Sequence, residues 1–132
     1  MVIIANAEVK TCVEAWSGEV STGRHQFITD KPASFGGHDK GPAPYDFICR
    51  GLISCTMITL RMYVQHKGIE WGAFSVEADF NANKEGREWI SRRLSFEQTL
   101  TEEARQKILD ICQKTPVTKI LLRSVEIETS IV

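Results

Sequence analysis

A largely apolar segment begins at Pro44 and ends before Gly68. Proline suits the first turn of a helix, where its missing N–H is no loss, and Asp46 suits the positive helix N-terminus. Apolar residues occupy most of the helix circumference: Phe47, Ile48, Leu52, Ile53, Met57, Ile58, Leu60, Met62 and Val64. The pattern predicts a helix over Pro44–Gln65, ~33 Å long and buried on nearly all sides. We expect it to be the central helix of the fold.

Short strands are expected before this helix. The segment from Ala5 to Trp16 is strand-like, Ser17-Gly18 is a turn signal, and alternation from Arg24 to Thr29 indicates a second strand. Two strands so close together predict an antiparallel hairpin or meander. The stretch from Lys31 to Pro44 is rich in proline and glycine, and we expect a long irregular connection there.

Two further helices are expected in the second half of the chain. Thr99 or Thr101 can cap the first of them, which runs to Cys112 with apolar side chains on one face. Pro116 ends that helix, and with Thr115 as its cap it can open a short helix through Leu122.

Three more strands complete the predicted order. Alternation favours strands over Ile69–Phe80 and Trp89–Phe96, joined by a turn at Asn81–Gly86, and a last strand over Val125–Ile131. The resulting order is β-β-α-β-β-α-α-β. It predicts an α+β fold in which the long helix packs on an antiparallel sheet.

Length and composition narrow the class of protein. With 132 residues, the chain is expected to form a single domain over residues 1–132. A net charge of −1 gives no general affinity for nucleic acid or for an anionic membrane. The uncharged run between Arg50 and Arg61 is too short to span a bilayer, and the N-terminus does not resemble a secretory signal. We therefore expect a cytoplasmic protein without a membrane partner.

The four cysteines are Cys12, Cys49, Cys55 and Cys112, and they form no CxxC pair. Without an export signal we expect reduced thiols. The three histidines have no ligand spacing and the glycines form no phosphate loop, so no metal and no cofactor is expected. A reactive Cys55 would need a nearby cation. Arg50 and Arg61 lie on other helical faces, so the pattern alone leaves its role open.

The segment GPAPYDFICRGLISCTMITLRMY resembles the signature helix of the OsmC/Ohr family, the osmotically inducible protein C and organic hydroperoxide resistance proteins. The agreement extends upstream in GRHQFITDKPASFGG and downstream in LTEEARQKILDICQKTPVTKIL, and so covers essentially the whole chain. The resemblance implies an OsmC-like fold and an intertwined homodimer with two active sites at the interface. It also implies a peroxidatic cysteine, a second resolving cysteine, and an arginine and a glutamate that hold the thiolate and orient the peroxide.

Carried onto this sequence, the resemblance makes Cys55 the nucleophile. Arg24 is the candidate for the arginine that stabilises its thiolate, and the alternative is that Arg24 is a solvated arginine of the strand. Tyr45 stands at the family's glutamate position, with Asp46 beside it and about 100° further round the helix.

The second cysteine is also replaced. Thr115 stands at its position, and Cys112 lies three residues earlier. Cys112 is either a core residue, with Thr115 an ordinary cap, or a displaced resolving thiol.

Three hypotheses follow. The first is a thiol peroxidase that reduces a small-molecule organic hydroperoxide through Cys55 and is regenerated by an external thiol or dithiol if Cys112 cannot resolve it. The second is a non-peroxidase OsmC-like protein that binds a small apolar ligand at the dimer interface. The third is a dimeric protein in which Cys55 is simply buried.

Overall fold

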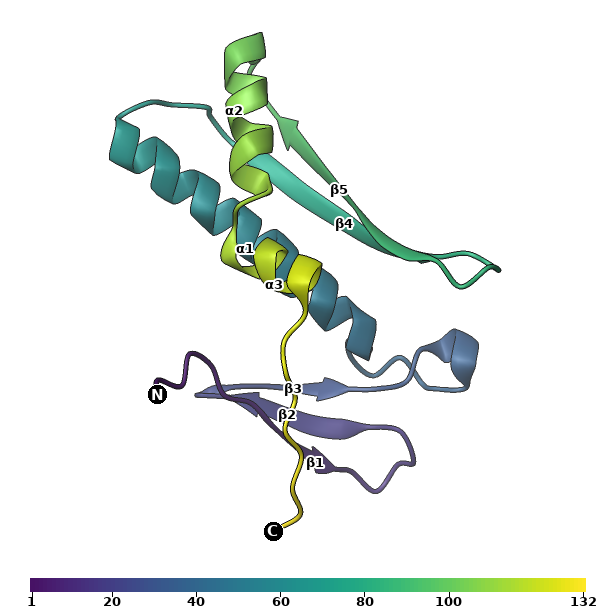
Figure 1. Ribbon diagram of the computed structural model, residues 1–132. Coiled ribbons are helices and arrows are strands. Elements are labelled where there is room, and N and C mark those ends of the chain that lie inside the picture. Colours follow the sequence, from purple (N-terminus) through teal and green to yellow (C-terminus); the bar gives the residue numbers. More distant parts are fainter. The chain divides into compact units, whose positions relative to one another are not determined.

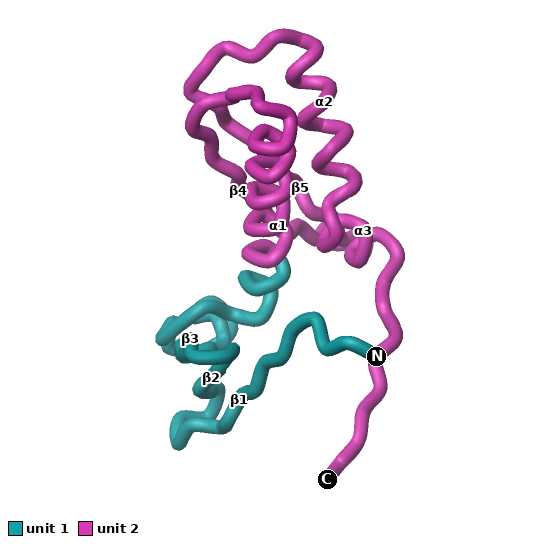
Figure 2. Tube along the Cα trace, turned by 90° about the vertical axis from the view of Figure 1, so that its left-hand side faces the viewer, with its two compact units in different colours: residues 1–48 teal, residues 49–132 magenta.

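The computed structural model describes residues 1–132 and forms two compact units, residues 1–48 and residues 49–132 (Figure 2). The boundary falls within the long helix α1 (Pro44–Lys67). Helices and antiparallel strands occur in separate stretches of the chain, which confirms the α+β class. The single domain over residues 1–132 stays a prediction.

The first unit contains a three-stranded antiparallel meander of β1 (Glu8–Thr11), β2 (Gly18–Thr22) and β3 (His25–Thr29) (Figure 1). The sequence pattern predicts only two strands here, with a turn at Ser17-Gly18. That interpretation is wrong, since Gly18 begins β2. A Cβ on Gly18 would lie 2.7 Å from Cγ2 of Val9, so this glycine permits the close approach of β1 and does not mark a turn.

A tight turn joins β2 to β3. Gly23 has a φ of 57°, in the left-handed region that glycine enters without strain. Arg24 follows it in the same turn and is exposed, so it precedes the strand in which it was expected.

The long connection after β3 is organised by Asp30, whose side chain is 3% exposed. Its carboxylate accepts hydrogen bonds from the backbone N–H groups of Lys31 (2.7 Å), His38 (3.0 Å) and Lys40 (3.2 Å). A short 3₁₀ helix, η1 (Ala33–Phe35), lies within this loop. Burial acts to raise the pKa of Asp30, but the three N–H donors outweigh it and leave the pKa below its ordinary value. The predicted irregular connection is confirmed.

Helix α1 begins at Pro44, as predicted, and ends at Lys67, two residues beyond the predicted end. Gly68 follows it with a φ of 65°, which is typical of a glycine that terminates a helix. At the N-terminus, the Asp46 carboxylate accepts from the Ala43 N–H at 2.8 Å.

The predicted burial of α1 on nearly all sides is wrong for the single chain. Only Leu52, Thr56 and Leu60 are fully buried, whereas the large apolar side chains Met57, Ile58 and Met62 are 36%, 52% and 63% exposed. The sequence shows that a face is apolar, but it does not show what covers it. By length and composition alone α1 could also cross a membrane, and the core helix of a soluble protein has the same properties.

The second unit contains a two-stranded antiparallel hairpin of β4 (Phe74–Ala82) and β5 (Glu88–Phe96). The hairpin was predicted, but β4 begins five residues later than Ile69. Trp71 lies in the loop before β4 and is 7% exposed. Its ring stacks on Tyr63 with centroids 5.6 Å apart. The segment before Phe74 therefore contributes to the core from a loop and not from a strand.

Helices α2 (Glu102–Cys112) and α3 (Pro116–Arg123) follow the hairpin as predicted. Of the two threonines considered, Thr101 caps α2, because its hydroxyl accepts from the Ala104 N–H at 3.1 Å. The core of this unit joins α1, the loop before β4 and α2 through Leu60, Trp71, Ile108 and Cys112.

The predicted last strand, Val125–Ile131, is absent. Neither sheet contains a strand from this segment, and the side chains of Val125, Ile127 and Ile131 are 57%, 84% and 100% exposed. An alternating pattern stabilises a strand only where a neighbouring strand takes its backbone hydrogen bonds, and this segment has no such neighbour.

Candidate active site

Cys55 lies near the middle of α1 and is partly buried. Its Sγ is 4.0 Å from the hydroxyl of Thr59, one helical turn further on, and the thiol is free. Ile58 and Met62 lie three and seven residues after Cys55, on the same side of the helix, and both are exposed. The thiol therefore borders the uncovered apolar face of α1.

The other residues expected around Cys55 from the resemblance lie in the first unit. Arg24 is exposed in the β2–β3 turn, and Tyr45 is 56% exposed in the first turn of α1. Asp46 binds the Ala43 N–H and so stabilises the start of the helix. The contacts of these three residues with Cys55 stay predictions.

Cys112 is the last residue of α2 and is 2% exposed. Burial raises the pKa of its thiol, and the positive charge of Arg92 offsets this in part. A thiol held neutral in apolar surroundings is a poor nucleophile. The structure thus gives Cys112 a packing role, and its role as a resolving thiol stays a prediction.

Thr115 is fully buried and caps α3, as the sequence indicated. Its Oγ1 lies 2.6 Å from the Oγ1 of Thr118 and accepts from the Thr118 N–H at 3.4 Å. At the position where the resemblance implies a second cysteine, the chain therefore places a hydroxyl in a hydrogen-bond network, where it cannot form a disulfide.

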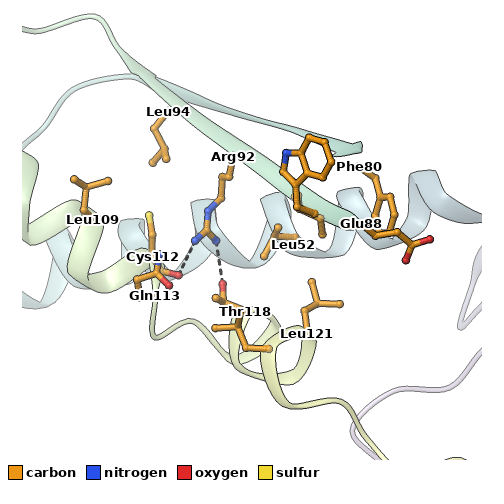
Figure 3. A pocket seen from close by; sticks show the side chains of 13 residues that line it. Leu52, Phe80, Glu88, Arg92, Leu94, Leu109, Cys112, Gln113, Thr118 and Leu121 are labelled. Carbon is orange, nitrogen blue, oxygen red and sulfur yellow. Dashed lines mark hydrogen bonds between the residues drawn. The ribbon is translucent and has the colours of Figure 1, made fainter. Parts of the chain in front are cut away.

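Arg92, which is not among the site residues expected from the sequence, connects this region to α1. Its Nη1 donates to the hydroxyls of Thr56 and Thr118, both at 2.9 Å. Its Nη2 donates to the backbone carbonyl of Cys112, also at 2.9 Å. Figure 3 shows the guanidinium extending from β5 toward the junction of α2 and α3. One side chain thereby joins four elements of the second unit.

The sequence did contain a signal for Arg92. Along β5 it lies an even number of residues from Ile90, Leu94 and Phe96, so it shares the apolar face of the strand with them. Its cross-strand partner on β4 is Ala78, whose small side chain leaves room beside it. A single charge in an otherwise apolar alternation marks a side chain that must find polar partners inside the fold.

A cavity of about 620 Å³ lies beside Arg92. Cys55 is not among the residues that line it. The lining residues come from α1, β4, β5, α2 and α3 and are mostly apolar: Leu52, Phe80, Glu88, Trp89, Ile90, Arg92, Leu94, Leu109, Cys112, Gln113, Thr118, Leu121 and Leu122. The second unit therefore has two separate chemical features, a thiol on α1 and an apolar cavity that contains an arginine.

The family model for OsmC-like proteins matches residues 37–130. The chain belongs to the OsmC-like family. The match covers all of α1 with Cys55, the hairpin, and α2 and α3 with Thr115. No curated protein matches the chain.

Solved structures share the OsmC-like fold at low sequence identity. An OsmC-like protein from Mycoplasma pneumoniae has a TM-score of 0.76 at 15% identity, and the alignment covers 94% of this chain and 91% of that one. An organic hydroperoxide resistance protein OsmC from Legionella pneumophila gives 0.72 at 15% identity over 94% and 92%. An organic hydroperoxide resistance protein from Elizabethkingia anophelis gives 0.68 at 18% identity over 96% and 93%. These similarities show the OsmC-like fold.

Proposed function

We propose that this OsmC-like protein is a thiol peroxidase that reduces organic hydroperoxides through Cys55 and serves in oxidative-stress defence. The observation that carries the proposal is a free, partly buried thiol at the family's cysteine position in α1. Structural relatives described as organic hydroperoxide resistance proteins support it.

The proposed reaction has two stages. The Cys55 thiolate attacks the distal oxygen of the hydroperoxide, the O–O bond breaks, and the alkoxide takes up a proton to leave as an alcohol. Cys55 is left as a sulfenic acid. An external thiol then condenses with the sulfenic acid, which releases water and forms a mixed disulfide with Cys55. A second thiol group attacks the external sulfur of this mixed disulfide, forms a disulfide with it and releases the Cys55 thiol.

An external thiol or dithiol is proposed as the reductant because neither residue near the family's second-cysteine position suits the task. Thr115 has no sulfur, and the thiol of Cys112 is buried with a raised pKa. No cofactor and no metal enters this reaction.

We also propose that the protein acts as a homodimer in the cytoplasm. The exposed apolar side chains Met57, Ile58 and Met62 give α1 a face that a second copy of the helix would bury. In that dimer, Arg24 would stabilise the Cys55 thiolate, and Tyr45 or Asp46 would help to orient the peroxide.

The test is hydroperoxide consumption by the purified full chain, with cumene hydroperoxide as oxidant and a dithiol as reductant. Cys55→Ser is expected to abolish consumption, and a sulfenic acid trap is expected to label Cys55 in the wild type. Cys49→Ser is the matched control, because Cys49 is also a partly buried free thiol of α1. Unchanged consumption by Cys55→Ser would refute the proposal.

The alternative function is binding of a small apolar ligand at the dimer interface without peroxidase activity. The replacement of both family partners, by Tyr45 and Thr115, favours it. A ligand that binds wild type and Cys55→Ser equally, together with no hydroperoxide turnover by the wild type, would support this alternative. Rapid turnover by the wild type would exclude it.

A further inference from the structure

The feature that carries a further inference is the positive charge of Arg92, which has no acidic partner. The salt bridges of the structure join other residues, and all three acceptors around Arg92 are neutral: two threonine hydroxyls and one backbone carbonyl. Its neighbour Arg93 shows the opposite arrangement, with Nη2 at 2.7 Å from Glu77 and 2.9 Å from Asp79. Of these two consecutive arginines, only Arg92, on the apolar face, has no carboxylate as an ion-pair partner.

The guanidinium of Arg92 also has unused donors. Arginine has five N–H groups, and the three hydrogen bonds of Arg92 use two on Nη1 and one on Nη2. The Nε–H and the second Nη2 hydrogen have no protein acceptor. Free guanidinium N–H groups form charge-assisted hydrogen bonds with a carboxylate.

The surroundings of Arg92 are apolar on both sides. In Figure 3, Leu94 and Leu109 lie on one side of the guanidinium, and Leu52 and Leu121 lie on the other. The volume of about 620 Å³ falls within the range of pockets that hold small organic ligands, ~300–1,000 Å³. An apolar cavity with one charged side chain matches a ligand with one charged group and an apolar body.

The only acidic lining residue does not cancel this charge. Glu88 is exposed and forms no ion pair with Arg92, and Figure 3 shows it beside Phe80, away from the guanidinium. The interior of the cavity is therefore electropositive, and its exposed end is the only part with an acidic side chain.

We propose that this cavity binds a single-chain carboxylate, with the carboxylate on Arg92 and the hydrocarbon chain against the leucines that flank it. The network of Thr56, Thr118 and the Cys112 carbonyl holds the guanidinium in place before the ligand arrives, which lowers the entropic cost of binding. The site is distinct from the Cys55 thiol and does not depend on peroxidase activity.

The test is calorimetric titration of the full chain with dodecanoate below its micelle concentration. We expect saturable binding that Arg92→Leu weakens about tenfold to a hundredfold, the range for a charged hydrogen-bonded pair. Arg93→Leu is the matched control, because it removes an adjacent arginine from the opposite face of the strand, and it is expected to bind as the wild type does. Cys55→Ser is expected to bind equally, since Cys55 does not line the cavity. The neutral analogue dodecan-1-ol is expected to bind at least about tenfold more weakly than dodecanoate.

A second variant covers the case in which Arg92→Leu does not fold. Leu109 lines the cavity and is 54% exposed, so Leu109→Glu is expected to fold, to add a negative charge near the guanidinium and to weaken dodecanoate binding several-fold. Absence of saturable binding to the wild type, equal binding by folded Arg92→Leu or by Leu109→Glu, or equal affinity for dodecan-1-ol would each overturn the proposal.

Discussion

Thr56→Val tests whether the Arg92 network stabilises the fold. Thr56 is fully buried in α1, and its hydroxyl accepts from Arg92 at 2.9 Å and donates to the Leu52 carbonyl at 2.7 Å. Valine keeps the shape of threonine but replaces the hydroxyl with a methyl group, so both hydrogen bonds are lost. The substitution isolates the polar contribution of one buried side chain.

The magnitude follows from the two lost bonds. The loss of the hydrogen bond to the Leu52 carbonyl costs little, because that carbonyl keeps its helical partner, the Thr56 N–H. The loss of the hydrogen bond from Arg92 leaves this charged donor with one acceptor fewer, which costs about 1.5–3 kcal/mol. The added methyl returns about 0.8 kcal/mol of apolar burial. The free energy of unfolding is therefore expected to fall by about 1–2 kcal/mol, and Tm by about 4–8 °C.

The assay is urea and thermal unfolding at fixed protein concentration, with Thr59→Val as the control. Thr59 is a partly buried threonine of the same helix that forms no hydrogen bond with Arg92. Thr59→Val is therefore expected to change the free energy of unfolding by no more than about 0.5 kcal/mol. In an Arg92→Met background, Thr56→Val should cost less than about 0.5 kcal/mol, because no charged donor remains to lose its acceptor. Equal costs of Thr56→Val in the two backgrounds would refute the reasoning.

Three further outcomes are expected. Because the folded-state pKa of Asp30 lies below its unfolded value, its carboxylate adds stability above the unfolded pKa that is lost as the pH falls through the folded pKa. Acid unfolding below about pH 4 should therefore be less steep in Asp30→Asn, and superimposable acid curves would contradict this. Thr115→Ala removes the α3 cap and the partner of the Thr118 hydroxyl, so it should cost about 1–2 kcal/mol in urea unfolding, and Thr115→Ser should recover most of it. Gly41→Ala should destabilise by about 2 kcal/mol or more, because its Cβ would lie 1.6 Å from the Ile28 carbonyl oxygen, and an unchanged urea midpoint would show that the loop adjusts freely.

Several elements could be predicted from the sequence because their signals are local. Pro44 and Gly68 bound α1, Thr101 and Thr115 cap the two later helices, and alternation locates the β4–β5 hairpin. Each signal acts within a few residues, through backbone geometry or a hydrogen bond to the nearest turn. The motif around Cys55 is local in the same sense, so the family and the candidate nucleophile could be identified before the fold was known.

The predictions are wrong where one sequence pattern is compatible with two different structures. Ser17-Gly18 is typical of a turn, but Gly18 allows β1 to approach β2. The alternation of Val125–Ile131 fits a strand, but a strand also needs a neighbour, and the sequence does not specify one. In both cases the outcome depends on a segment distant in the sequence.

The sequence by itself determined the family, the extent of α1 and the position of Cys55 within it, because these depend on short-range patterns. Only the tertiary structure showed that α1 has an uncovered apolar face, that Cys112 is buried in the core, and that Arg92 joins α1 to α2 and α3. Arg92, Thr56 and Thr118 are separated by 26 or more positions along the chain. Such contacts depend on how strands and helices pack, and no local pattern of residues encodes that packing.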